Sequence, residues 1–311
     1  MKKAAWLIVI VLLLLSLSLF LVRERKSGPA GESNTVVTTI YPLYFITKKI
    51  AGDALTVKRL IKPGSEIHSF SPTPVDMVEL DRADLLITLG RDLEPWTEKL
   101  AAATKVEVLP LEKRLVLIET GRRGKGEEHD AHHHHGGVNP HVWLDFDNDI
   151  RMVQAIESKL ARIYPEKKDL FEANAKALQR AFEELKESYR SGLSRCSKET
   201  ILVGHDAFGY LGKAYRFKSE SIMGVFAHSR PDAARIAALS RMIREKQLHY
   251  LFTDPIESSK SASQLAADMN LTLASLYTVG NISLKNENRG EDMLSLLRFD
   301  LKQLRKGLEC H

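Results

Sequence analysis

The sequence predicts an α/β protein with two similar lobes, each built on a mostly parallel four-stranded sheet and joined by one long rigid helix. Apolar, β-rich runs alternate with amphipathic helical runs both before and after a single long helical stretch. Such alternation is typical of a parallel sheet that helices cover on both faces. A chain of 311 residues, 44% of them hydrophobic, is also long enough for two domains rather than one.

The first lobe is expected over residues 35–164. Several runs rich in β-branched and apolar residues end at Gly, Pro or polar positions, which predicts strands. The runs between them carry apolar residues at helical spacing. The expected strands are residues 35–41, 55–61, 84–89 and 105–111, and the expected helices are residues 44–52, 73–83, 94–103 and 147–163.

The long helix is expected over residues 165–195. Pro165 suits the first turn of a helix, and no other proline interrupts the segment. From Phe171 to Leu193 the apolar residues step by four and three positions without a slip. This single stripe predicts a strut that lies across the two lobes. A dimeric coiled coil is the alternative.

The second lobe is expected over residues 196–311, where the alternation of strand and helix patterns resumes. Each half of the chain therefore repeats one plan, which predicts two sheets of the same kind. The expected strands are residues 200–204, 217–223, 248–253 and 271–276, and the expected helices are residues 207–215, 231–245, 261–269 and 290–307.

The N-terminal segment, residues 1–26, indicates export. Lysines precede an almost wholly apolar run, and charged residues follow it. About 20 apolar residues can span a bilayer, so the segment is a signal peptide or an uncleaved membrane anchor. We favour the anchor over cleavage near Ala30, and no cysteine for lipid attachment lies near the end of the run. Residues 27–34 form a Gly/Ser/Pro-rich tether, and the body is expected in the periplasm or at the outer face of the cytoplasmic membrane.

The charge pattern argues against a nucleic-acid partner. The net charge of +5 is modest, acidic and basic residues interleave, and no basic stripe with aromatic residues is present. The two cysteines, Cys196 and Cys310, have no Cys-x-x-Cys spacing, which excludes a zinc ribbon. In an exported protein they can pair, and the sequence leaves a disulfide and two free thiols equally open.

A histidine-rich loop is expected over residues 127–137. It contains His129 and the run from His132 to His135, flanked by glycines. A run this dense is typical of metal capture, and its position within the chain argues against an expression tag. We expect it to raise the local zinc concentration or to sense zinc without forming the tight site.

Three single histidines share a different context. His68, His141 and His205 each follow a predicted strand and its turn or loop. Ligands of open α/β sheets bind beyond the carboxyl ends of the strands. We therefore expect these neutral imidazoles to converge between the lobes, and three histidines with a carboxylate or water suit tetrahedral Zn²⁺.

Several segments together carry a resemblance to a known family; they are residues 63–68, 71–76, 83–87, 139–145 and 204–210. The chain resembles the metal-binding solute-binding proteins of ABC importers, the zinc and manganese family that includes high-affinity zinc uptake proteins. The resemblance extends over nearly everything from Thr35 to Leu308. It implies two α/β lobes joined by a long rigid helix, a metal ion in the cleft between them, and an ABC permease as partner.

Carried over by position, the resemblance implies that His68, His141 and His205 are the metal ligands. Histidine at the third position resembles the zinc branch, because manganese members usually carry a carboxylate there. The histidine-rich loop also resembles the zinc branch. Zn²⁺ is therefore the expected transported ligand, with Mn²⁺ as the alternative.

The fourth ligand stays open. The family often has an aspartate in a turn near its last strand, but residues 277–280 contain none. Water, Glu66 and Asp254 are the candidates. Asp145 and Asp206 are candidates to orient the imidazoles, with capping of a helix N-terminus as the alternative role.

These features predict a zinc-capturing component of an importer rather than an enzyme. The alternatives are a manganese-binding homologue and a surface adhesin of the same fold. A zinc hydrolase is least favoured, because the sequence has no His-Glu-x-x-His motif and no carboxylate obviously poised as a general base. We expect a monomer with small lobe shifts on binding, whose zinc affinity falls below about pH 6.5 as the histidines protonate.

Overall fold

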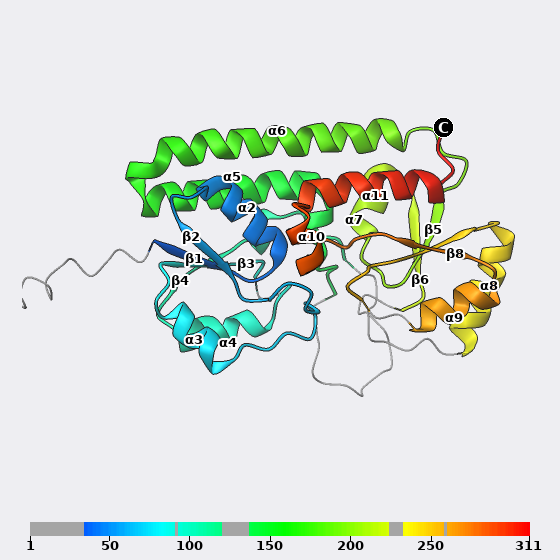
Figure 1. Ribbon diagram of the computed structural model, residues 1–311, viewed down its shortest axis with the longest axis horizontal. Helices are drawn as coiled ribbons and strands as arrows, with labels where there is room; N and C mark the ends of the chain where they lie inside the picture. Colours follow the sequence, from blue (N-terminus) through cyan, green and yellow to red (C-terminus); the bar gives the residue numbers. More distant parts are fainter. Residues whose placement is uncertain (1–33, 91–92, 120–136, 224–232, 258–259) are drawn as a thin grey trace, which may run out of the picture. The chain divides into compact units, whose positions relative to one another are not determined.

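The computed structural model describes residues 34–90, 93–119, 137–223, 233–257 and 260–311 (Figure 1). Residues 35–311 group into one compact unit, apart from residues 1–34. The predicted signal peptide or anchor, the tether except Asn34, and the histidine-rich loop except Gly137 lie outside the described residues. Among the helices that the structure describes, none has the length and apolar character needed to cross a membrane.

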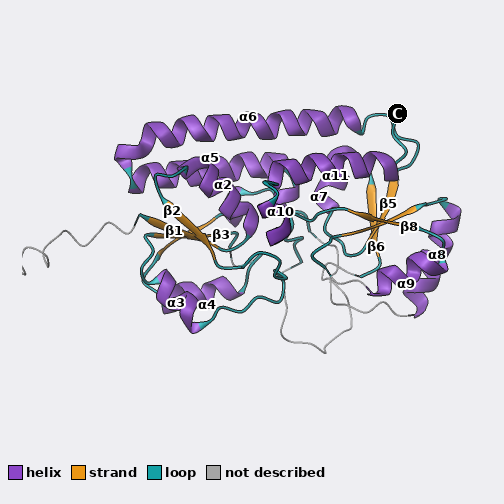
Figure 2. Cartoon of the chain, in the orientation of Figure 1, coloured by secondary structure: helices purple, strands orange, loops and turns teal. Residues whose placement is uncertain are grey.

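The first lobe is a parallel sheet between helices. Its strands are β1 (Thr35–Thr38), β2 (Thr56–Arg59), β3 (Leu85–Thr88) and β4 (Glu107–Pro110), and its helices include α2 (Tyr41–Ala51), α3 (Pro74–Leu80) and α4 (Trp96–Ala103). The strand order is β2-β1-β3-β4, and every pairing is parallel. Neighbouring residues of a strand face opposite sides, so Val36 packs in the core with α2, whereas Val37 packs with α3 and α4 (Figure 2).

The second lobe repeats this plan. Its strands are β5 (Thr200–Val203), β6 (Lys218–Ser221), β7 (Tyr250–Thr253) and β8 (Thr272–Ser275), and its helices are α7 (Gly209–Tyr215), α8 (Ala233–Glu245), α9 (Lys260–Asp268), α10 (Leu284–Asn288) and α11 (Met293–Gly307). The order β6-β5-β7-β8 is again fully parallel. Ile201 packs in the core with α11, whereas Leu202 packs with α8 and α9. The predicted two-lobe α/β fold is confirmed.

The last helix differs from the sequence-based expectation at its start. We expected a helix from Gly290, but α11 begins at Met293, and the short helix α10 precedes it. The cause is a capping box, in which Asp292 accepts a hydrogen bond from the backbone of Ser295 and Ser295 accepts one from the backbone of Asp292. Such a box fixes where a helix begins more strongly than the apolar pattern does.

One long helix, α6 (Lys168–Gly192), connects the lobes, and α5 (Phe146–Ile163) of the first lobe packs against it. The helix α6 has 25 residues and is about 38 Å long at 1.5 Å per residue. It is shorter than the expected 165–195, because Pro165 opens a separate 3₁₀ turn. Its apolar stripe is buried against α5, α2 and α11 (Figure 1), so the stripe is not available for the alternative dimeric coiled coil.

One hydrophobic core runs through both lobes. It contains residues of β1 and β3, of β5 and β7, and of α5, α6 and α11. The hydroxyl of Tyr189 on α6 donates a hydrogen bond of 2.7 Å to the carbonyl of Leu297 on α11. Close-packed interiors resist shear, so this shared core favours the small lobe shifts that we expect on binding.

A disulfide joins Cys196, just beyond α6, to Cys310, just beyond α11. This resolves the alternatives that the sequence left open. The bond closes a loop over a sequence separation of 114 residues. It therefore links the end of the connecting helix to the C-terminal helix of the second lobe.

Replacing both cysteines by alanine is expected to lower the free energy of unfolding by about 2–5 kcal/mol, because the cross-link restricts a long loop in the unfolded chain. Urea denaturation of the 35–311 unit measures this loss. Reductant should destabilise the wild-type unit by a similar amount and leave the double variant unchanged. An unchanged unfolding midpoint in the double variant would show that the disulfide adds no stability.

Glu94 links the carboxyl ends of two strands in the first lobe. Its Oε2 atom accepts hydrogen bonds from the Thr39 hydroxyl (2.9 Å) and the Leu89 backbone N–H (2.7 Å). Its Oε1 atom is buried and has no hydrogen-bond partner within the described part of the chain. Burial raises the pKa of Glu94 from 4.5 to about 7, although both hydrogen bonds act in the opposite direction.

This raised pKa predicts a pH-dependent stability. The folded chain holds a proton that the unfolded chain has lost, so about 3 kcal/mol of stability is present below pH 4.5 and is lost as the pH rises through about 7. Glu94→Gln removes the ionisation. We expect the Gln variant to unfold at higher urea than the wild type at pH 8, with the advantage shrinking toward pH 4.5. A constant difference across this range would contradict the assignment.

Candidate metal centre

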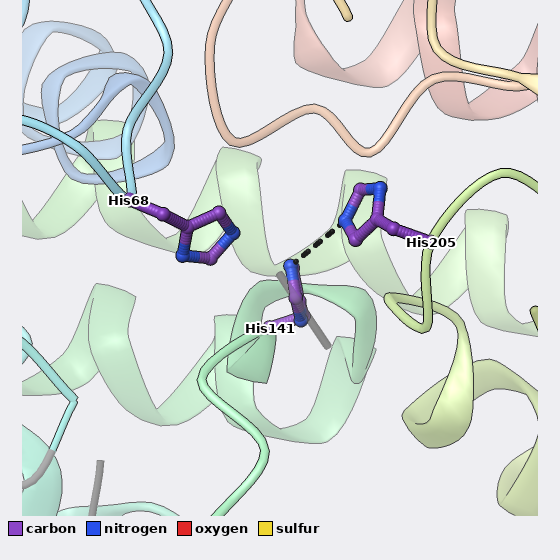
Figure 3. Close-up of side chains that lie close together, drawn as sticks. All are labelled: His68, His141 and His205. Atoms are coloured by element: carbon purple, nitrogen blue, oxygen red, sulfur yellow. Dashed lines mark hydrogen bonds between the residues drawn. The ribbon is translucent and has the colours of Figure 1, made fainter. Parts of the chain in front are cut away.

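Three histidines from separate segments meet between the lobes (Figure 3). His68 lies in the loop that follows β2, His141 directly precedes the 3₁₀ turn Val142–Leu144, and His205 follows β5. Their potential ligand atoms all lie within 4.8 Å of one another. The three ring centroids are 5.2 to 6.2 Å apart. The structure thus brings together the three histidines that the sequence singled out.

The closest approach is between His141 and His205. Their Nε2 atoms face each other at 3.3 Å (Figure 3). Two nitrogen ligands on tetrahedral zinc, each at about 2.0–2.1 Å, stand about 3.3 Å apart. Both side chains are almost completely buried, so the separation already matches an edge of a zinc coordination tetrahedron.

The ring of His141 is fixed by its neighbours. Its Nδ1 atom lies 2.9 Å from the side-chain oxygen of Asn139, which also accepts the His141 backbone N–H. An acceptor at this position favours the proton on Nδ1, which makes Nε2 the nitrogen that faces the other histidines and can bind a metal ion. The Trp143 ring packs edge-on against the imidazole at 5.4 Å, and its Nε1 donates across the cleft to the carbonyl of Thr278 at 2.7 Å.

The ring of His205 is fixed by a carboxylate. Its Nδ1 atom lies 2.7 Å from Oε2 of Glu257, in the loop after β7. Burial alone lowers the pKa of His205, but the hydrogen bond and the negative charge of Glu257 outweigh it, and the net shift is upward. A carboxylate on Nδ1 orients the ring and makes Nε2 a stronger metal ligand.

Comparison with known proteins agrees with this geometry. Residues 36–307 match the family model described as zinc-uptake complex component A, periplasmic (ZnuA). The chain belongs to this family.

Curated relatives carry zinc in their names. The zinc-binding lipoprotein AdcA of Streptococcus pneumoniae is 30% identical over 293 residues, which are 93% of this chain and 58% of that protein. The chain thus spans little more than half the length of AdcA. The high-affinity zinc uptake system protein ZnuA of Bacillus subtilis is also 30% identical, and the alignment covers 92% of this chain and 91% of that protein.

Solved structures share the fold. The Zn(II)-bound ZnuA-like domain of S. pneumoniae AdcA superimposes with a TM-score of 0.75 at 27% identity, over 88% of this chain and 98% of that one. The laminin-binding protein Lmb of Streptococcus agalactiae, described as a bifunctional protein with adhesin and metal transporting activity, gives a TM-score of 0.77 at 26% identity, over 88% and 99%.

In this ZnuA-family chain, both carboxylates suggested as a fourth ligand accept hydrogen bonds from loops near the three histidines. Glu66 accepts backbone hydrogen bonds from His68 (2.9 Å) and Ser69 (2.8 Å), which shape the loop that carries His68. Asp254 accepts from the Ile256 N–H at 2.9 Å and from the N–H and hydroxyl of Thr278 at 2.7 Å each. Both carboxylates hold loops in place through these hydrogen bonds.

The two aspartates suggested as orienting groups have other partners. Asp145 caps the N-terminus of α5, accepting from the N–H groups of Asp147 and Asn148. Its alternative role as a helix cap is therefore the correct one. Asp206 accepts a hydrogen bond of 3.4 Å from the Ser219 hydroxyl. Glu257 was not predicted from the sequence, where its signal is limited to its place in a loop at the carboxyl edge of the second sheet.

Proposed function

We propose that this chain is the extracytoplasmic solute-binding protein of a zinc importer. It captures Zn²⁺ between its lobes with His68, His141 and His205 and delivers the ion to an ABC permease. The observation that carries the proposal is the placement of two buried Nε2 atoms at the spacing of a zinc tetrahedron, with the third imidazole beside them. Membership of the ZnuA family supports the same function.

Zinc is favoured over manganese by the chemistry of these ligands. Imidazole nitrogen suits Zn²⁺, whereas Mn²⁺ prefers carboxylate, carbonyl and water oxygen. The two carboxylates suggested as a fourth ligand, Glu66 and Asp254, already accept hydrogen bonds. The names of AdcA and ZnuA also support zinc as the cargo.

The remaining parts of the chain fit this role. In this proposal residues 1–26 export the protein or anchor it, residues 27–34 tether it, and the histidine-rich loop concentrates zinc near the cleft. Lobes over residues 35–164 and 196–311 flank the helix α6. The protein acts as a monomer and not as an enzyme.

Zinc-limited growth tests the proposal. A strain that lacks the gene should take up radioactive zinc slowly and grow poorly in medium depleted of zinc, and a plasmid with the wild-type gene should restore both. The His141→Ala gene should fail to restore them, whereas His249→Ala, which changes an exposed histidine, should succeed. Normal zinc uptake in the deletion strain under zinc depletion would contradict the importer role.

An adhesin role is the second candidate, because the Lmb structure is described as both adhesin and metal transporter. The same strains separate the two functions. Attachment to immobilised laminin should be unchanged by deletion if the chain serves zinc uptake alone. If the deletion strain loses attachment but takes up zinc normally, and the His141→Ala gene restores attachment, the adhesin role is favoured.

A further inference from the structure

A pocket of about 610 Å³ lies in the first lobe beside the candidate metal centre. Its walls come from the loops that follow β1, β2 and β3 and from α3 and α4, which lie together on one side of the lobe (Figure 1). It therefore sits beyond the carboxyl ends of parallel strands, where open α/β sheets bind ligands. Its volume falls within the roughly 300–1,000 Å³ of small-molecule sites.

The walls of the pocket are mainly apolar and aromatic. Phe70 and Trp96 meet edge to face with ring centroids 5.0 Å apart. Met77 on α3 and Trp143 near the metal centre add further apolar surface. Two indole rings and a phenyl ring favour a flat aromatic occupant.

The pocket borders the metal centre at His68. His68 lines the pocket and also belongs to the histidine cluster. Trp143 lines the pocket and packs against His141. A molecule in the pocket therefore touches one candidate ligand and the direct neighbour of a second. Three imidazoles leave one position of a tetrahedral zinc ion for another ligand.

Glu94 supplies a polar group to the pocket wall. Its Oε2 atom is used by Thr39 and Leu89, whereas its buried Oε1 atom has no partner within the described part of the chain. Because Oε1 is buried, Glu94 shapes this wall and presents no exposed acceptor to a ligand in the pocket.

We propose that this pocket binds the organic part of a small zinc chelate: an aromatic ring with a nitrogen that occupies the fourth position on zinc. The protein then accepts zinc together with a small nitrogen chelator as well as the free ion. This inference rests on the proposed zinc capture by His68, His141 and His205, and it names the form in which the ion is taken.

Calorimetric titration of the zinc-loaded 35–311 unit tests it with two probes. Imidazole ligates zinc but is too small to fill the pocket, whereas 4-phenylimidazole adds a ring that can. We expect 4-phenylimidazole to bind about 10- to 100-fold more tightly, because burial of the phenyl ring adds to ligation. If the two probes bind with equal affinity to protein that binds zinc tightly, the pocket proposal is wrong and the proposed function stands. A unit that binds no zinc tightly overturns the proposed function as well.

Variants locate the binding. Met77→Trp fills the pocket from a half-buried position on α3 and should abolish the preference for 4-phenylimidazole without changing the affinities for zinc or imidazole. Phe70→Leu removes one ring and should reduce the preference several-fold, which keeps the test decisive if Met77→Trp unfolds. If a folded Phe70→Leu or Met77→Trp unit keeps the full preference for 4-phenylimidazole over imidazole, the probe binds elsewhere and the inference is wrong.

Discussion

His141→Ala is expected to remove the tight zinc site. An apparent binding energy of about 10–16 kcal/mol shared by four ligands is about 3–4 kcal/mol for each, so loss of one imidazole weakens binding on the order of 100- to 1,000-fold. His141 is also the most constrained of the three, fully buried with both its backbone and its ring held by Asn139. Competition of the 35–311 unit against a zinc-binding dye measures the change.

His249→Ala provides the matched control, because this histidine is exposed and lies far along the chain from the cluster. It should leave the tight site unchanged. The histidine-rich loop also binds zinc in our proposal, so both variants should be made with His129 and His132 to His135 replaced by serine. Unchanged tight binding in His141→Ala on that background would exclude His141 as a ligand.

Glu257→Ala is expected to weaken zinc binding about 10- to 100-fold, because removal of the group that orients a metal-binding histidine typically has this effect. Its carboxylate lies 2.7 Å from Nδ1 of His205 and fixes which nitrogen faces the ion. Glu257→Gln keeps an oxygen acceptor and should lose less. Zinc competition measures both, and urea unfolding of the zinc-free unit shows whether the variants only change stability.

Glu187→Ala is the control for this series, since Glu187 is exposed and pairs with Arg190 on the surface of α6. It should leave zinc affinity unchanged. The expected order of affinity is wild type, then Glu257→Gln, then Glu257→Ala. Equal zinc affinity for wild type and Glu257→Ala would show that His205 needs no orienting carboxylate.

The fold could be predicted from sequence because each strand carries its own signal. Val36 and Val37 face opposite layers, and so do Ile201 and Leu202, which is why these strands read as continuous apolar runs. The helix boundaries were less predictable. The start of α11 depends on the cap at Asp292, and the start of α6 depends on the turn at Pro165, both local effects that an apolar stripe does not reveal.

The histidine cluster could be predicted in part for a similar reason. His205 lies two residues beyond the end of β5, and the carboxyl end of a parallel strand has a fixed place in the fold. Glu257 could not be predicted, because its position depends on the path of the loop between β7 and α9. Asp145 illustrates the opposite case: it immediately follows the 3₁₀ turn after His141, yet it serves as the cap of α5.

X-ray absorption at the zinc edge of the 35–311 unit, loaded with one equivalent of zinc and lacking the loop histidines, tests the central claim most directly. We predict four light-atom ligands at about 2.0–2.1 Å, with the multiple-scattering signature of three imidazoles. His141→Ala should reduce that signature to two imidazoles. A coordination sphere made of oxygen ligands alone would contradict zinc capture by His68, His141 and His205.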